Sequence, residues 1–130
     1  MNKKIIIIGS RRRDSVEDYH CVLREFKKWY DYGDVLVSGG CPKGGDLFAE
    51  VIANNLQIPI IIHYPKKPLP GLPKWDYAKV MYERNTVVVN EAEEDTVVIA
   101  CVSPDRKGGT EDTIKKWRSR KFDGNLLRIV

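Results

Sequence analysis

Five short apolar runs, spaced along the chain and rich in β-branched residues, constrain the fold of this sequence more than any other feature. They cover Lys3–Ile8, Val35–Val37, Ile58–Ile62, Val97–Val102 and Leu126–Val130. Continuous apolar runs of this length are typical of strands that are buried on both faces, as in parallel sheets. The sequence therefore predicts a parallel sheet of about five strands.

Helical patterns fill the gaps between these runs. In the first gap, apolar residues recur at spacings of three and four, which predicts one buried helical face: Val16, Tyr19, Leu23, Phe26 and Tyr30. Ser15 with Asp18 predicts a capping box at the start of this helix, and Gly33 predicts its end. The second gap repeats the pattern at Leu47, Phe48, Val51, Ile52 and Leu56. A third helix is predicted over Tyr77–Glu93, and a fourth starts near Thr110.

The alternation of strands and helices predicts one α/β domain over residues 1–130. Such alternation implies a parallel sheet with helices on both faces and right-handed crossovers, which is a single Rossmann-like domain. A length of 130 residues suits one domain, and no internal repeat interrupts it. The segment Tyr64–Lys74 breaks the rhythm, and its high proline content predicts a stiff loop.

Composition and charge narrow the classes of function. Hydrophobic residues make up 42% and charged residues 31%, as in soluble globular proteins. No apolar run approaches the ~20 residues that cross a bilayer, and the run ending at Ile8 is too short for a secretory signal. We therefore expect a cytoplasmic protein without a membrane partner. The net charge of +4 favours an anionic partner, either a nucleotide or a nucleic acid.

The cysteines favour a reducing compartment. Cys21, Cys41 and Cys101 are odd in number, far apart and without CxxC spacing, which favours free thiols over a zinc site or disulfides. Cys101 lies in an apolar run and is predicted to be buried, whereas Cys41, in a glycine-rich loop, is predicted to be exposed. We expect neither a metal nor a cofactor.

Polar, glycine-rich segments follow three of the predicted strands, where open α/β sheets bind ligands. The first is Gly9-Ser10-Arg11, in which glycine admits a close ligand, serine offers a hydroxyl and arginine offers a donor fork for phosphate or carboxylate. The alternative is an ordinary turn in which Arg11–Arg13 is a solvated basic run.

The second segment runs from Ser38 to Asp46 and holds four glycines in seven residues: Gly39, Gly40, Gly44 and Gly45. A loop of this kind before a helix can cradle an anion with its N–H groups, although it matches neither the Walker nor the dinucleotide fingerprint. Asp46 is either an N-cap or an acceptor for ribose hydroxyls.

The third segment, Gly108-Gly109-Thr110, also precedes a helix and could form a second anion cradle. Two further groups of residues carry open alternatives. Arg84-Asn85, within the third helix, belongs either to the site or to a solvated face. Aromatic side chains around the proline-rich segment either pack in the core or stack on a base: Tyr64, Trp75 and Tyr77.

Together these segments resemble the SLOG superfamily, a Rossmann-like group that includes the LOG-type phosphoribohydrolases and the single-strand-DNA-binding DprA domain, and in particular its small YspA/YpsA-related branch. The resemblance covers nearly the whole chain in order, through Gly9-Ser10-Arg11, Ser38-Gly39-Gly40 with Gly44-Gly45-Asp46, Trp75 followed by Arg84-Asn85, and Gly108-Gly109-Thr110. It implies a pocket for a nucleotide or nucleotide-derived ligand at these loops. By this analogy Arg84 would reach the phosphate or ribose, and Asn85 would help to hold the pocket.

Two positions depart from the phosphoribohydrolase pattern. That family has PGGxGTxxE in its second glycine-rich loop, with a catalytic Glu, whereas Thr113 fills the Glu position here. Hydrolysis of an N-glycosidic bond needs a carboxylate, which leaves Glu111 and Asp112 as shifted catalytic candidates. The usual Ala of the first glycine loop is replaced by Gly44 or Gly45.

Three functions follow from these observations. The leading one is a nucleotide-ligand binder that acts as a sensor or carrier, as a homodimer if it follows related folds. The second is a nucleotide N-glycosidase that uses Glu111, Asp112 or Asp46. The third is a DprA-like nucleic-acid-binding module that uses Arg11–Arg13 and a basic C-terminal stretch. It is less favoured because these charges also fit a solvated helix face: Lys115, Lys116, Arg118, Arg120 and Lys121.

Overall fold

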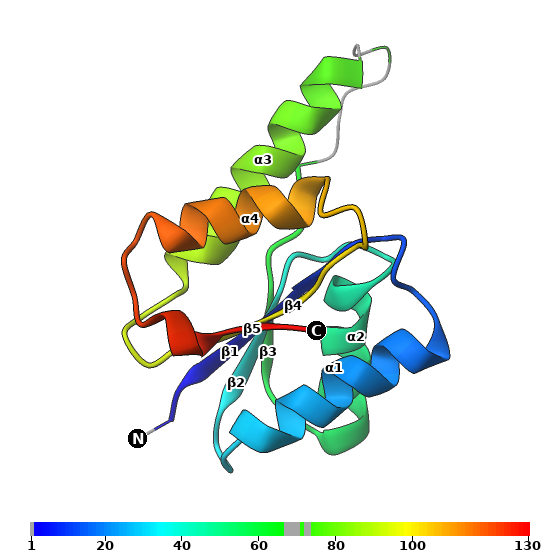
Figure 1. The fold of residues 1–130 in the computed structure, drawn as a ribbon. Coiled ribbons are helices and arrows are strands. Elements are labelled where there is room, and N and C mark those ends of the chain that lie inside the picture. The colour runs from blue at the N-terminus through cyan, green and yellow to red at the C-terminus, as the bar shows by residue number, and fades with distance from the viewer. Residues whose placement is uncertain (1, 67–70, 72–73) are drawn as a thin grey trace.

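A five-stranded, all-parallel sheet forms the centre of the molecule (Figure 1). The computed structural model describes residues 2–66, 71 and 74–130, with the backbone alone at 74–76. The strand order is β3-β2-β1-β4-β5. The strands are β1 (Lys4–Gly9), β2 (Val35–Ser38), β3 (Ile60–Ile62), β4 (Val97–Cys101) and β5 (Leu127–Ile129). The predicted single Rossmann-like α/β domain is confirmed.

In the described part of the chain, four α-helices cover the sheet in two layers (Figure 1). They are α1 (Val16–Trp29), α2 (Gly45–Leu56), α3 (Lys74–Asn90) and α4 (Gly109–Arg118), and a short 3-10 helix, η1 (Gly124–Leu126), precedes β5. Successive residues of β1 point to opposite layers: Ile5 and Ile7 join the core under α1 and α2, whereas Ile6 and Ile8 join the core under α3 and α4. Burial on both faces explains why the strand sequences are continuously apolar.

Helix α1 starts as predicted but ends earlier. The Ser15 Oγ accepts the Asp18 N–H at 3.1 Å, and the Asp18 carboxylate accepts the Ser15 N–H at 3.2 Å, which completes the capping box. The prediction that Gly33 ends the helix was wrong. Tyr30 already leaves the helix in an extended conformation with its ring stacked on Phe26, and Gly33, at φ +96°, serves the turn into β2 instead.

Helices α2 and α3 also differ from the sequence pattern. The buried face of α2 includes Ala49 and Ala53, whereas Leu56 is 49% exposed because it lies at the end of the helix. Helix α3 begins and ends three residues before its predicted bounds, since the chain turns after Asn90 through a bond from the Ala92 N–H to the Val89 carbonyl. Helix α4 begins one residue before the predicted Thr110.

The predicted stiff loop at Tyr64–Lys74 falls largely on residues that lie outside the described ranges. Of the described helices, none is long and apolar enough to cross a membrane.

The three cysteines carry free thiols, and Cys101 is fully buried as predicted. The prediction for Cys41 was wrong: it is buried as well, because its loop folds back onto the start of α2.

Candidate functional site

The strand order creates a crevice between the carboxyl ends of β1 and β4. The chain builds outward from β1 to β3 and then crosses to β4 on the other side of β1, so the loops that follow β1 and β4 diverge. A cavity of about 550 Å³ lies at this point. Its lining comes from the ends of β1 and β2 with their following loops, from the loop after β4, from α3 and from the first turns of α2 and α4.

The cavity brings together most of the predicted binding residues, which are far apart in the sequence. Those that line it are Gly9, Ser10, Arg11, Gly39, Asp46, Arg84, Asn85, Gly108, Gly109 and Thr110. The remaining four are not among the lining residues: Ser38, Gly40, Gly44 and Gly45. The three glycine-rich segments do meet at one cavity, whereas ligand contact by the lining residues stays a prediction.

The four residues outside the lining shape the first glycine loop. The Ser38 hydroxyl donates to the Asp46 carbonyl at 2.9 Å and accepts the Gly40 N–H at 3.1 Å. Gly44, at φ +73°, donates its N–H to Asp14 at 2.8 Å. A Cβ on Gly45 would lie 2.5 Å from the Gly9 nitrogen, so glycine here lets α2 start directly against the backbone of β1.

Asp46 lines the cavity from inside the first turn of α2. The N-cap alternative was wrong, because Gly44 holds that position and Asp46 lies two residues further along. The carboxylate accepts the Cys41 N–H at 3.2 Å and lies 3.4 Å from Arg84 Nη1. Burial raises the pKa of Asp46 above its ordinary value, although the Arg84 charge and N–H groups of the loop oppose this shift. Acceptance of ribose hydroxyls stays a prediction.

Arg84 and Asn85 join the two glycine-rich loops. The alternative that they form a solvated face was wrong, because the Arg84 side chain is only 9% exposed and Asn85 only 3%. Arg84 donates to the Gly39 carbonyl through Nη1 and to Asn85 Oδ1 through Nε at 3.1 Å. Asn85 Nδ2 donates to the Gly109 carbonyl at 3.2 Å, at the start of α4. The pair therefore braces the cavity from α3.

The shifted catalytic candidates lie outside the cavity lining. Glu111 pairs with Arg106 at 2.8 and 2.9 Å, and Asp112 accepts from Lys116 Nζ at 2.6 Å and from Asn85. Within the described ranges, Asp46 alone brings a carboxylate to the lining. Thr113, at the position where phosphoribohydrolases have Glu, lines the cavity and donates its hydroxyl to the Gly109 carbonyl.

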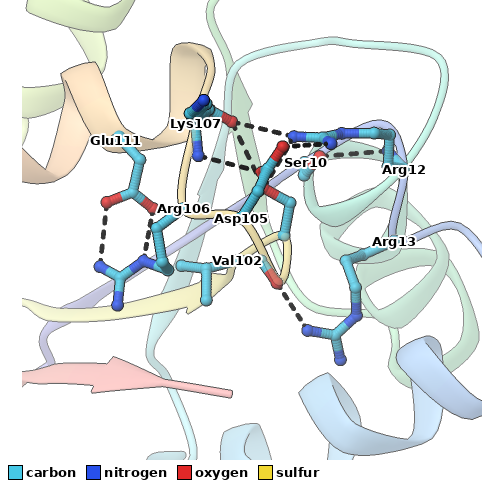
Figure 2. A network of polar contacts seen from close by, with 9 residues as sticks. Ser10, Arg12, Arg13, Val102, Asp105, Arg106, Lys107 and Glu111 are labelled. Atoms are coloured by element: carbon cyan, nitrogen blue, oxygen red, sulfur yellow. Dashed lines mark hydrogen bonds and ion pairs between the residues drawn. The ribbon is translucent and has the colours of Figure 1, made fainter.

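The three consecutive arginines have separate environments, and Figure 2 shows two of them. Arg12 reaches from the loop after β1 to Asp105 in the loop after β4, and Arg13 binds Asp18 and the carbonyls of Val102 and Val130. Arg11 lines the cavity, and its side chain makes no hydrogen bond to any described residue. The predicted basic run therefore presents one uncommitted guanidinium to the cavity.

Helix α3 forms one wall of the cavity, and the sequence indicated only some of its residues. Tyr77, Met81 and Tyr82 line it, and the first two share a helix face with Asn85 at a spacing of four, a periodicity that the sequence displays. Neither Tyr77 nor Tyr64 belongs to the core, since they are 42% and 66% exposed. The side chain of Trp75 lies outside the description.

Two further charged residues line the cavity, and the sequence indicated them only as parts of longer segments. Arg12 belongs to the basic run Arg11–Arg13, and Lys107 directly precedes the third glycine-rich segment. Neither position predicts which neighbouring loop the side chain faces. No group of three His, Cys, Asp or Glu side chains in the described residues could hold a metal ion. Comparison of the chain with models of protein families, with curated proteins and with solved structures finds no match.

Proposed function

We propose that this protein binds a nucleotide or nucleotide-derived ligand in the cavity between β1 and β4, as a sensor or carrier, and that it is a divergent member of the SLOG superfamily. The observation that carries the proposal is the composition of one cavity. It combines the uncommitted guanidinium of Arg11 and the glycine-rich start of α4 with the aromatic side chains of α3.

The anionic end of the ligand belongs near α4. Gly108 is the N-cap and supplies no side-chain hydrogen bond, so the first N–H groups of the helix remain free for an anion. No atom lies within 4 Å of a Cβ built on Gly108, which leaves room for a phosphate to approach the backbone. Arg11 and Lys107 add positive charge at the same side of the cavity.

The base end of the ligand belongs near α3. Tyr77 and Tyr82 offer aromatic faces, and Met81 offers a polarisable thioether between them. Aromatic stacking on a base contributes about 1–3 kcal/mol and tolerates any base, since every base has a π-face. Ser10, Asp46 and Thr110 supply polar groups for a sugar between the two ends.

Binding without hydrolysis is favoured over the N-glycosidase. Glycoside hydrolysis commonly uses two carboxylates that flank the bond, and Asp46 alone lines the cavity in the described part of the chain. Its carboxylate is already engaged by Cys41 and Arg84. We also propose a cytoplasmic location, for which the three free thiols argue.

Equilibrium dialysis tests the proposal. The protein is dialysed against AMP, ADP, cyclic AMP and ADP-ribose, and both chambers are analysed by chromatography. We expect at least one compound to be retained intact in the protein chamber. Free adenine formed only in that chamber would establish the N-glycosidase instead, with Asp46 as its first candidate. Equal distribution of every compound would contradict the binding of adenine nucleotides.

A further inference from the structure

The loops after β1 and β4 both line the cavity and form what we call its mouth, and one arginine joins them (Figure 2). Arg12, in the loop after β1, forms a bidentate pair with Asp105, in the loop after β4, with Nη1–Oδ2 and Nη2–Oδ1 distances of 2.7 and 2.6 Å. Its Nη2 also donates to the Ser103 hydroxyl at 2.9 Å and to the Lys107 carbonyl at 3.2 Å. The guanidinium is therefore committed to protein acceptors.

The contacts of Arg12 converge on Lys107, the residue just before the glycine turn. While Arg12 holds the Lys107 carbonyl, Asp105 accepts the Lys107 N–H at 3.2 Å, and the Ser103 hydroxyl donates to Asp105 at 2.8 Å. The next residue, Gly108, has φ +113° and open space around it, so its own packing fixes it little. The turn is held on its far side by the bond from Asn85 to the Gly109 carbonyl, and on its near side its position depends on how firmly Lys107 is held.

We propose that Arg12 is a positioning residue of the binding site: it fixes the N–H groups of Gly108–Thr110 toward the cavity by clasping Lys107 and Asp105, and it does not bind the ligand itself. The sequence does not predict this role, because three consecutive arginines of the same type give no sign of which one binds protein acceptors and which one faces the cavity. The effect on ligand affinity rests on the proposed function, whereas the ordering of the loop does not.

The same loop provides a matched control. Arg106 forms a bidentate pair with Glu111 at 2.8 and 2.9 Å, exposed to solvent like the Arg12 pair. The Arg106 pair joins residues five positions apart in the same segment, whereas the Arg12 pair joins two loops across the cavity mouth. Each substitution removes one positive charge and one bidentate pair. The comparison therefore distinguishes a pair that joins two loops from a pair that lies within residues 106–111.

The first test measures order in the protein without ligand. NMR order parameters of the Lys107–Thr110 amides are compared in wild type, Arg12→Ala, Arg12→Lys and Arg106→Ala, with thermal unfolding as a check of the fold. We expect Arg12→Ala to lower them from about 0.85 to below about 0.6, and Arg106→Ala to leave them unchanged. Lysine should restore them only in part, because one ammonium cannot form the bidentate fork. Unchanged values in a folded Arg12→Ala variant would overturn the proposal, as would an equal loss in Arg106→Ala.

The second test separates positioning from direct contact, with AMP as the probe. Arg12→Ala should weaken AMP binding about tenfold, mainly through faster dissociation, while Arg12→Lys recovers part of the affinity. Complete loss of binding in a variant whose loop remains ordered would mean that Arg12 contacts the ligand, contrary to the proposal. If wild type does not bind AMP, the proposed function fails for this probe, and the order parameters alone decide the role of Arg12.

Discussion

At the scale of single residues, neighbours in the sequence have different tasks because the backbone turns between them. Arg11, Arg12 and Arg13 follow β1 in succession, yet one faces the cavity, one bridges its mouth and one binds the carboxyl ends of β4 and β5. The charge of a basic run is therefore a poor guide to how many of its side chains can meet a ligand.

Replacement of Arg11 tests its assignment to the ligand. Arg11→Ala should weaken AMP binding at least tenfold, because a charge-assisted hydrogen bond contributes about 1.5–3 kcal/mol, and should leave thermal stability unchanged. Arg24→Ala, which removes an exposed arginine of α1, lowers the net charge equally and is the control. Affinity is measured by calorimetry. Equal losses in both variants would mean that the overall charge, and not Arg11, attracts the anion.

The buried thiol of β4 should be inert. Burial raises the pKa of Cys101 to about 11, with the nearby Arg13 charge opposing the shift, so almost none of it is thiolate at pH 8. Iodoacetamide at pH 8 should therefore label the partly exposed Cys21 well before Cys101 in the native protein. Peptide mass spectrometry measures the order. Labelling of Cys101 at the rate of Cys21 would contradict its burial.

At the scale of elements, the start of α2 packs directly against the end of β1, where Ile8 and Gly9 line the cavity. Gly45→Ala places a methyl group against the Ile8 carbonyl and the Gly9 nitrogen, which are backbone atoms that cannot rotate away. We expect a loss of about 1–3 kcal/mol in the free energy of unfolding, the usual cost of overpacking. Gly124→Ala is the control, because nothing lies within 4 Å of its Cβ. Urea unfolding measures both, and equal effects would refute the steric argument.

The elements also show how far the sequence could predict this fold. Strand positions and the α/β class followed from the β-branched runs, because burial on both faces forces such runs. Helix ends were harder: Gly33 has the residue type of a helix end, but Tyr30 left the helix first to stack on Phe26. The conformation at Tyr30, which the residue types do not predict, sets the helix end instead of the glycine.

The candidate site was predictable in its loops but not in its side-chain roles. The glycine-rich turns follow the carboxyl ends of the strands, and in a parallel sheet these ends all lie at one edge. The turns therefore predicted the edge of the sheet at which the cavity lies. Nothing local distinguishes Asp112, which pairs with Lys116 outside the cavity, from Asp46, which lines it. Likewise, the bond from Asn85 to the Gly109 carbonyl depends on the packing of α3 beside α4, which only the folded chain defines.

At the scale of the whole molecule, a buried ionic cluster and the cavity lie at opposite ends of the sheet. Asp34, just before β2, is almost fully buried and accepts the Lys3 N–H at 2.9 Å, the Lys3 ammonium at 2.5 Å and the Asp31 N–H at 2.8 Å. Burial alone would raise the pKa of Asp34, but these donors outweigh it and lower the pKa below the ordinary value. This cluster lies at the amino ends of the strands, away from the cavity.

The lowered pKa predicts a pH-dependent effect of Asp34→Asn. A depressed pKa stabilises the fold at pH values above the unfolded pKa of about 3.9, and this contribution is lost as pH falls through the folded value. At pH 7 the variant should lose about 2 kcal/mol, or roughly 5–10 °C in melting temperature. The gap to wild type should narrow in acid, when measured by calorimetry between pH 7 and pH 2.5. A gap independent of pH would contradict the ionic explanation, and AMP binding at pH 7 should remain unchanged.

The central place of β1 has a consequence for the order in which the chain assembles. On one side β1 pairs with β2, the next strand in the sequence. On its other side β1 pairs with β4, with Ile5 opposite Val97, and β4 is synthesised much later. Until then, the nascent first half can close only one edge of β1 and leaves an apolar strand edge open to other chains. The cavity, which needs both edges closed, completes late in synthesis, and the half-made domain is the species that a chaperone would have to protect.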